Sequence, residues 1–198
     1  MSNAVSVEKI AKALVIRFNR PEIRSPLSVF VLENLRANVA AADADAAIET
    51  IIFTGSNDVF ASGADLREIA AVTSATAPEF ARRGQRLMRQ IADSDKLTVA
   101  AVNGFCFGGA LDLALACERR IAAPHASFAH PGANLGIMTG WGGTQRLPRL
   151  VGEAAALEMF LTAKRVGANE ALRLGLIDRV TDDPLEYSIA NFSRPASS

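Results

Sequence analysis

Two glycine-containing loops are the parts of the sequence best suited to hold a negatively charged reaction centre. The first, residues 53–68, contains four small residues that let a ligand approach the backbone closely: Ala61, Ser62, Gly63 and Ala64. The second, residues 102–112, places Gly108 and Gly109 where we expect a helix to begin. Free N–H groups at the start of a helix, with the helix dipole behind them, favour negative charge. Each glycine cluster taken alone is more often a tight turn without a ligand.

Asp112 is the carboxyl residue of the second loop. It lies three residues beyond Gly109, within the first turn of the expected helix, where the dipole favours the ionised carboxylate. An ionised carboxylate in that place can act as a general base at neutral pH. The alternative is that Asp112 is only a favourable acid in a first helical turn, and the residues alone do not separate the two interpretations.

The elements that position these loops alternate between two types. Short apolar or β-branched runs predict strands at Ala13–Phe18, Thr50–Thr54 and Leu97–Val102. Apolar residues at helical spacing predict helices at 27–42, 78–93, from Gly108-Gly109 onward, at Glu153–Thr162 and at about 169–174. Strands that alternate with helices are connected by crossovers, so the expected class is α/β.

The composition describes an ordinary globular protein. A chain of 198 residues, 49% of them hydrophobic, can bury a sizeable core within one domain. Its 21 basic and 21 acidic residues balance, so the net charge predicts no nucleic-acid or anionic membrane partner. Every apolar run is far shorter than the roughly 20 residues that cross a bilayer, and the start has no long apolar segment. We therefore expect a cytosolic, cytoplasmic protein without a membrane partner.

Cys106 and Cys117 are the two cysteines of the chain. They lie eleven residues apart in an apolar stretch, a spacing that fits neither a metal-binding motif nor a disulfide framework. We expect both to be buried thiols and predict no metal site.

Several ordered motifs resemble those of the crotonase (enoyl-CoA hydratase/isomerase) family. The string SGADLRE resembles the family segment AGADxxE, and NGFCFGGALDLALACERRIAA resembles NGxxxGGGxELAxxCDxxxA. The agreement continues in NRPE at 19–22, GGTQRLPRLVG at 142–152 and LTAKRVGANEALRLGLIDRV at 161–180. The resemblance runs from about Val5 to about Val180. It implies one crotonase-like domain over residues 1–198, with a core at about 5–180 and a short polar tail at 191–198.

This resemblance implies an α/β spiral of ββα units that stabilises the enolate of an acyl-CoA thioester. The backbone N–H groups of Ala64 and Gly109 would form the oxyanion hole, and Asp112 would be the catalytic carboxylate. Removal of one such donor typically costs on the order of 100- to 1000-fold in rate. Coenzyme A would enter as part of the substrate, and no separate cofactor is expected. Substrate contacts are expected from Arg24, Ala61, Ser62, Gly63, Ala64, Asp65, Leu66, Gly108, Gly132 and Trp141.

The chain departs from the family pattern at the second of two glutamates that hydratases of the family carry. The first position is Asp112, whose side chain is shorter than that of glutamate, and the second is Gly132, which cannot move a proton. His130 could substitute because its ordinary pKa is close to neutral, although a core position is the preferred interpretation. Trp141 stands where the family usually has a small residue, and it either narrows the acyl pocket or only packs in the core. Arg24 is suggested for the CoA phosphates, with a solvated arginine as the alternative.

Three functions follow from these features. The leading one is an enoyl-CoA hydratase or double-bond isomerase. The second is another enolate reaction, decarboxylation or hydrolysis, which Gly132 favours, and the third is a non-catalytic acyl-CoA-binding module that a single-turnover assay would identify. Family members usually continue beyond a GLIDRV-like segment with helices that cover the active site. The resemblance therefore implies a shortened or missing C-terminal helical segment and a weakened homo-oligomer, where the family forms a trimer or dimer of trimers.

Overall fold

The computed structural model describes residues 4–192 and contains two sheets. The larger sheet has the order β1 (Val5–Ile10), β2 (Ala13–Phe18), β3 (Thr50–Thr54), β5 (Leu97–Val102), β7 (Arg119–Ala122) and β10 (Arg179–Val180). The smaller sheet has the order β4 (Val59–Ala61), β6 (Phe105–Phe107), β8 (Ser127–Ala129) and β9 (Val166–Gly167). The pairs β1–β2 and β8–β9 are antiparallel, and the other pairs are parallel.

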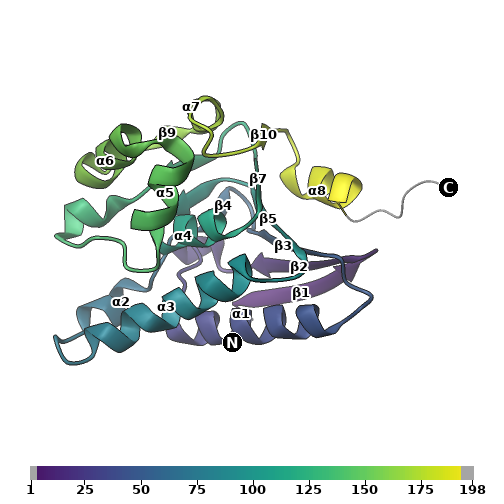
Figure 1. Ribbon diagram of the computed structural model, residues 1–198, viewed down its shortest axis with the longest axis horizontal. Helices are drawn as coiled ribbons and strands as arrows, with labels where there is room; N and C mark the ends of the chain where they lie inside the picture. Colours follow the sequence, from purple (N-terminus) through teal and green to yellow (C-terminus); the bar gives the residue numbers. More distant parts are fainter. Residues whose placement is uncertain (1–3, 193–198) are drawn as a thin grey trace.

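The chain alternates between the two sheets, which produces a repeated ββα unit (Figure 1). Strands β3 and β4 are followed by α2 (Leu66–Ala70) and α3 (Ala77–Ala92), and strands β5 and β6 are followed by α4 (Gly109–Ala116). Strands β7 and β8 are followed by the 3-10 helix η2 (Pro131–Leu135), α5 (Gly143–Val151) and α6 (Glu153–Thr162). Because the small-sheet strands are parallel, the loops that follow them lie at one edge and can form a common site.

Helices cover both faces of the larger sheet. Helix α1 (Val29–Ala44) packs against α3, which packs against α4, and Figure 1 shows α1 and α3 side by side along one face. Helix α8 (Pro184–Phe192) contacts β3, β5 and β7 on the opposite face. The remaining helices are η1 (Pro21–Ile23) and α7 (Ala168–Arg173). Helix α4 is apolar apart from Asp112 and is buried from Ala110 to Ala116, so its first turn is fixed from several sides.

Buried apolar periodicity predicted the longest elements well. The three expected strands are confirmed at both ends, and the expected helix at Glu153–Thr162 is confirmed. The helices expected at 27–42, 78–93 and 169–174 occur with bounds shifted by one or two residues. The six-residue strand β1 was not predicted. The strands of two to four residues were not predicted either, because so few residues carry no readable period.

The expected polar tail at 191–198 falls partly within α8, which ends at Phe192. The backbone carbonyl of Phe192 accepts a hydrogen bond from the Thr50 hydroxyl at 2.7 Å, so this end of the helix is tied to β3. The rest of that tail, 193–198, lies outside the described residues.

The two cysteines, membrane-spanning helices and metal clusters were considered in the sequence, and the structure gives a finding on each. Cys106 and Cys117 are free and buried, as expected, and burial raises the pKa of both thiols. Within residues 4–192 no helix is long and apolar enough to cross a membrane. The same residues contain no cluster of three or more His, Cys, Asp or Glu side chains that could hold a metal ion.

Candidate active site

A cavity of about 440 Å³ lies where the two glycine loops meet the segment between β8 and α5. Its wall is mostly apolar, with side chains from α2, α3, η2 and α6. Among the described residues that line it, only Asp112 and His130 have titratable side chains. The cavity therefore combines an apolar compartment with one carboxyl and one imidazole, the arrangement expected of a small-molecule site.

The two glycine loops contact each other backbone to backbone. Gly63 has the left-handed φ of +88°, and a Cβ at this position would lie only 2.6 Å from the backbone N of Gly109. The N–H of Leu27 donates to the Gly63 carbonyl at 2.7 Å, which fixes the first loop from the outside. A side chain at position 63 would force the loops apart, so glycine is required there.

The N–H groups of Ala64 and Gly109 are free to bind an oxyanion. Both residues line the cavity, and within the described part of the chain neither N–H has a hydrogen-bond acceptor. Gly109 is the first residue of α4, and Gly108 before it has φ +57° and provides no side-chain cap. The N–H of Gly109 therefore stands at the positive end of the dipole of α4, where negative charge is favoured.

Asp112 points into the cavity one turn along α4 and is completely buried. Its Oδ2 accepts a hydrogen bond from the hydroxyl of Thr139. Burial raises the pKa of Asp112 to about 7, and the Thr139 hydroxyl and the charge of Arg146 only partly oppose this effect. Burial thus outweighs the helix dipole, and Asp112 is present near neutral pH as both the acid and the expected carboxylate.

His130 lies at the end of β8, and its ring is 3% exposed. Its Nε2 is 3.6 Å from Oδ1 of Asp112, and the ring packs against Phe160 with centroids 5.1 Å apart. Burial lowers the pKa of His130 to about 4, so the imidazole is neutral at pH 7. The preferred interpretation of a core histidine is right about burial, but the side chain also lines the cavity beside the carboxyl.

Gly132 lines the cavity in η2 and has no room for a side chain. A Cβ there would lie 2.5 Å from the carbonyl oxygen of Ile137, whose N–H donates to the Gly132 carbonyl at 3.0 Å. Its φ is not left-handed, so the obstacle to a glutamate is this backbone contact. The site therefore has no second carboxyl at this position.

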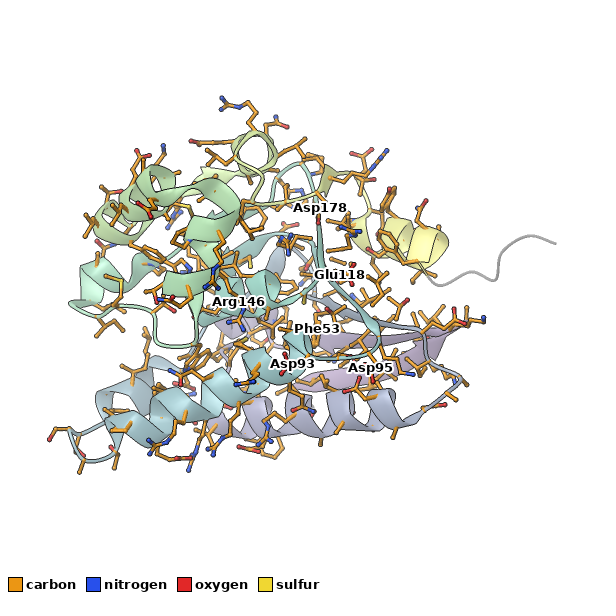
Figure 2. The ribbon with its side chains drawn as sticks, viewed as in Figure 1. Phe53, Asp93, Asp95, Glu118, Arg146 and Asp178 are labelled. Atoms are coloured by element: carbon orange, nitrogen blue, oxygen red, sulfur yellow. The ribbon has the colours of Figure 1, made fainter. Side chains whose placement is uncertain are left out.

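Trp141 forms one wall of the cavity and is buried between two helices. A Cβ added to Gly84 of α3 or to Gly109 of α4 would overlap its indole ring. A second hollow of about 500 Å³ shares the segment Thr139 to Trp141 with the first, so this segment separates the two. Arg146 extends from α5 beside this segment (Figure 2), and its guanidinium donates to the carbonyl oxygens of Trp141 and Met88.

The other sequence-predicted contact residues divide into two groups. Ser62, Leu66 and Gly108 line the cavity. Arg24, Ala61, Gly63 and Asp65 do not appear in its lining.

The structure shows where each of these four residues lies outside the cavity lining. Ala61 is buried in β4, and Gly63 supports the contact between the loops. Asp65 caps α2 and pairs with Arg67 at 2.7 Å, which lowers the pKa of its carboxyl. Arg24 is exposed directly after η1, with its guanidinium 5.3 Å from the centroid of the Phe105 ring.

Sequence reasoning missed Thr139 and the apolar wall of the cavity. This wall includes Ile69, Val72, Phe80, Ile137, Met138 and Phe160. These side chains come from α2, the connection that follows it, α3, α6 and the connection before α5, so only their meeting in space identifies them. Thr139 carried no local signal, because a single threonine in a glycine-containing loop is common.

Comparison with known proteins agrees with this geometry. The family model described as enoyl-CoA hydratase/isomerase matches residues 8–188. The chain is 42% identical over 177 residues to a crotonyl-CoA hydratase of Syntrophomonas wolfei, covering 89% of this chain and 68% of that protein. It is 36% identical over 181 residues to a short-chain-enoyl-CoA hydratase of Clostridium acetobutylicum, covering 91% and 69%.

Two solved structures show the same fold. The enoyl-CoA hydratase of Bacillus anthracis superposes with a TM-score of 0.88 at 33% identity, covering 95% of this chain and 74% of that one. Pseudomonas aeruginosa DspI superposes with a TM-score of 0.91 at 35% identity, covering 98% and 82%.

Proposed function

The chain belongs to the enoyl-CoA hydratase/isomerase family, the crotonase family, and we propose that it hydrates a short-chain 2-enoyl-CoA through an enolate. The observation that carries the proposal is the buried carboxyl of Asp112 in the same cavity as the free N–H groups of Ala64 and Gly109. Addition of water across a conjugated double bond moves charge onto the thioester oxygen, which fixed donors stabilise.

Asp112 is the group that exchanges a proton with the α-carbon in this proposal. Because its pKa is about 7, both its acid and its carboxylate forms are present near neutral pH. The acid form can give a proton to the α-carbon during hydration, and the carboxylate can remove one in the reverse direction. A pKa near the working pH makes both directions accessible.

The size of the cavity supports a short acyl group. Its volume of about 440 Å³ is modest for a ligand site, and the indole of Trp141 occupies part of the space between α3 and α4. Two relatives carry names that specify crotonyl-CoA or short-chain enoyl-CoA. A four-carbon enoyl-CoA is therefore the first substrate to test.

Double-bond isomerisation is a second candidate, favoured by the single carboxyl of the cavity. Conversion of a 3-enoyl-CoA into a 2-enoyl-CoA removes a proton from the α-carbon and returns one to the γ-carbon. One acid–base group can perform both transfers, and no water has to be activated. The absence of room for a side chain at Gly132 does not obstruct this reaction.

The proposal is tested by incubating the protein with crotonyl-, 3-enoyl-, malonyl- and 3-hydroxyacyl-CoA and following products by mass spectrometry. We expect crotonyl-CoA to become 3-hydroxybutyryl-CoA. Asp112→Asn should lower kcat by roughly 100- to 10000-fold with little change in affinity. Full activity of Asp112→Asn would refute this role, and recovery of every thioester unchanged would identify a binding module.

A further inference from the structure

We propose that His130 is the second proton-transfer group of this site, taking the proton of the attacking water while Asp112 supplies the proton of the α-carbon. The inference rests on the proposed hydration and assigns to His130 the removal of a proton from water, which Asp112 does not perform while it protonates the α-carbon. It gives the site two acid–base groups although position 132 cannot carry a side chain.

Two unpaired ring nitrogens lie beside the Asp112 carboxyl at the cavity. Both nitrogens of His130 are buried and have no hydrogen-bond partner among the described residues. Oδ1 of Asp112 is buried next to them, and the backbone N–H groups of Trp141 and Gly143 lower the pKa of this carboxyl. Nε2 of His130 and Oδ1 of Asp112 are 3.6 Å apart, too far for a good direct hydrogen bond. Buried polar atoms are nearly always paired with protein or ordered water, so this group of atoms is suited to hold a reacting water.

Packing alone does not account for the histidine. Its ring contacts Phe160, a position where an aromatic hydrocarbon side chain would pack without unpaired nitrogens. Leaving a buried polar group unsatisfied costs free energy of folding, and His130 carries two such atoms. A cost of this kind is common where buried polar groups serve a reaction.

The proposed step balances without any further reactant. The water oxygen bonds to the β-carbon while one water proton moves to a ring nitrogen of His130. The carboxylic acid proton of Asp112 moves to the α-carbon, and the enolate oxygen between the two events is held by the N–H groups of Ala64 and Gly109. The site is left with a carboxylate and an imidazolium, and transfer of the proton from His130 back to Asp112 restores the neutral pair.

Burial favours this neutral starting state. It raises the pKa of Asp112 to about 7 and lowers that of His130 to about 4, so between these values both groups are uncharged. Arg146 of α5 is the other charged group that acts on Asp112, while α6 presents the uncharged Phe160 to His130. The two groups interact, so the pH limits of the reaction belong to the pair.

This assignment predicts opposite pH dependences for two reactions of one site. Hydration requires the acid form of Asp112, so kcat should fall as pH rises through about 7. Exchange of the α-proton of butyryl-CoA in D2O requires the carboxylate, so its rate should rise over the same range. If Asp112 alone activated water as a base, both rates would rise together, and that result would overturn the proposal.

Two substitutions separate proton transfer from packing. His130→Phe keeps a ring against Phe160, and His130→Gln keeps a hydrogen-bonding group that cannot become a cation. We expect both to lower crotonyl-CoA hydration by roughly 100- to 10000-fold while α-proton exchange stays within a few-fold of wild type. His125→Gln changes the chain's other histidine, which is exposed, and should leave both rates unchanged. Circular dichroism confirms folding of each variant.

The remaining outcomes are decisive. Normal hydration by His130→Phe would overturn the proposal, and so would recovery of hydration in His130→Gln, because a hydrogen-bonding role would then suffice. An equal loss of hydration and exchange would show that His130 only holds Asp112 in place. If the wild-type protein does not hydrate crotonyl-CoA, the proposed function itself fails, whereas wild-type hydration that persists in His130→Phe or His130→Gln refutes the His130 step alone.

Discussion

The hydroxyl of Thr139 donates a hydrogen bond to Oδ2 of Asp112, from a connection 27 residues further along the chain. This bond holds Oδ2, while Oδ1 lies 3.6 Å from Nε2 of His130. It also favours the ionised form of Asp112, in opposition to burial. Thr139 thus orients the carboxyl and limits the rise of its pKa.

Removal of this hydroxyl should move the titration of Asp112. In Thr139→Val the carboxylate loses the hydrogen bond that stabilises its charge, so the pKa of Asp112 should rise further above its usual value. The pH at which α-proton exchange of butyryl-CoA reaches half its maximum should move upward. Thr139→Ser keeps the hydroxyl and serves as the control. Coincident pH profiles of the valine variant and wild type would show that the bond does not affect titration.

The raised pKa of Asp112 should also make stability depend on pH. Its pKa rises from 3.8 to about 7 on folding, so the contribution to stability is complete below about pH 4 and is lost as pH rises toward 7. The loss in the free energy of unfolding is on the order of 4 kcal/mol, because a pKa difference of one corresponds to about 1.36 kcal/mol. Asp112→Asn should therefore match wild type at pH 4 and exceed it above pH 7.

Urea unfolding of both proteins across this pH range measures the difference. The lowered pKa of His130 has the opposite effect, with stability lost as pH falls from 6.5 toward 4, and it is shared by both proteins to first order. A stability difference that is constant from pH 4 to 8 would contradict the raised pKa of Asp112.

Truncation of Trp141 should widen the range of acyl groups. In Trp141→Ala the wall between the two hollows loses its indole, so a longer chain can extend from the cavity toward the second hollow. We expect kcat/KM for an eight-carbon enoyl-CoA to rise at least about tenfold relative to that for crotonyl-CoA, a gain of about 1.4 kcal/mol in relative transition-state binding. Trp141→Phe should give a smaller change. An unchanged ratio would place the acyl chain elsewhere.

Gly84 provides a stability test of the same wall. Replacement of glycine by alanine inside a helix usually stabilises by about 0.5–1 kcal/mol. Here the added methyl group would overlap the indole of Trp141, so Gly84→Ala should destabilise by about 1–3 kcal/mol instead.

The sign of this effect should reverse when the indole is absent. In a Trp141→Ala background the same glycine-to-alanine change should be stabilising, because only the helix propensity remains. Urea unfolding of the two single variants and the double variant measures the coupling. Additive changes would mean that the two residues do not touch as the structure places them.

The longest elements could be read from the sequence because their cause is local. Strands β2, β3 and β5 are continuous apolar runs, and the stripe of α3 that includes Leu87 and Ile91 repeats at helical spacing. The small residues around Gly63 and Gly109 likewise indicated the two loops that meet at the cavity, since close backbone approach needs small residues and free N–H groups belong to any helix start.

The protonation state and partners of the catalytic candidates were decided only by the tertiary structure. Position in a first helical turn favours an ionised Asp112, but segments distant in sequence cover the carboxyl, remove water and raise its pKa to about 7. The same packing brings His130 to 3.6 Å from it, leaves Arg24 outside the cavity and closes position 132 to a side chain. The exposure of a side chain to water and the residues it contacts depend on all the atoms around it in space. Periodicity and spacing in the sequence describe only its neighbours along the chain.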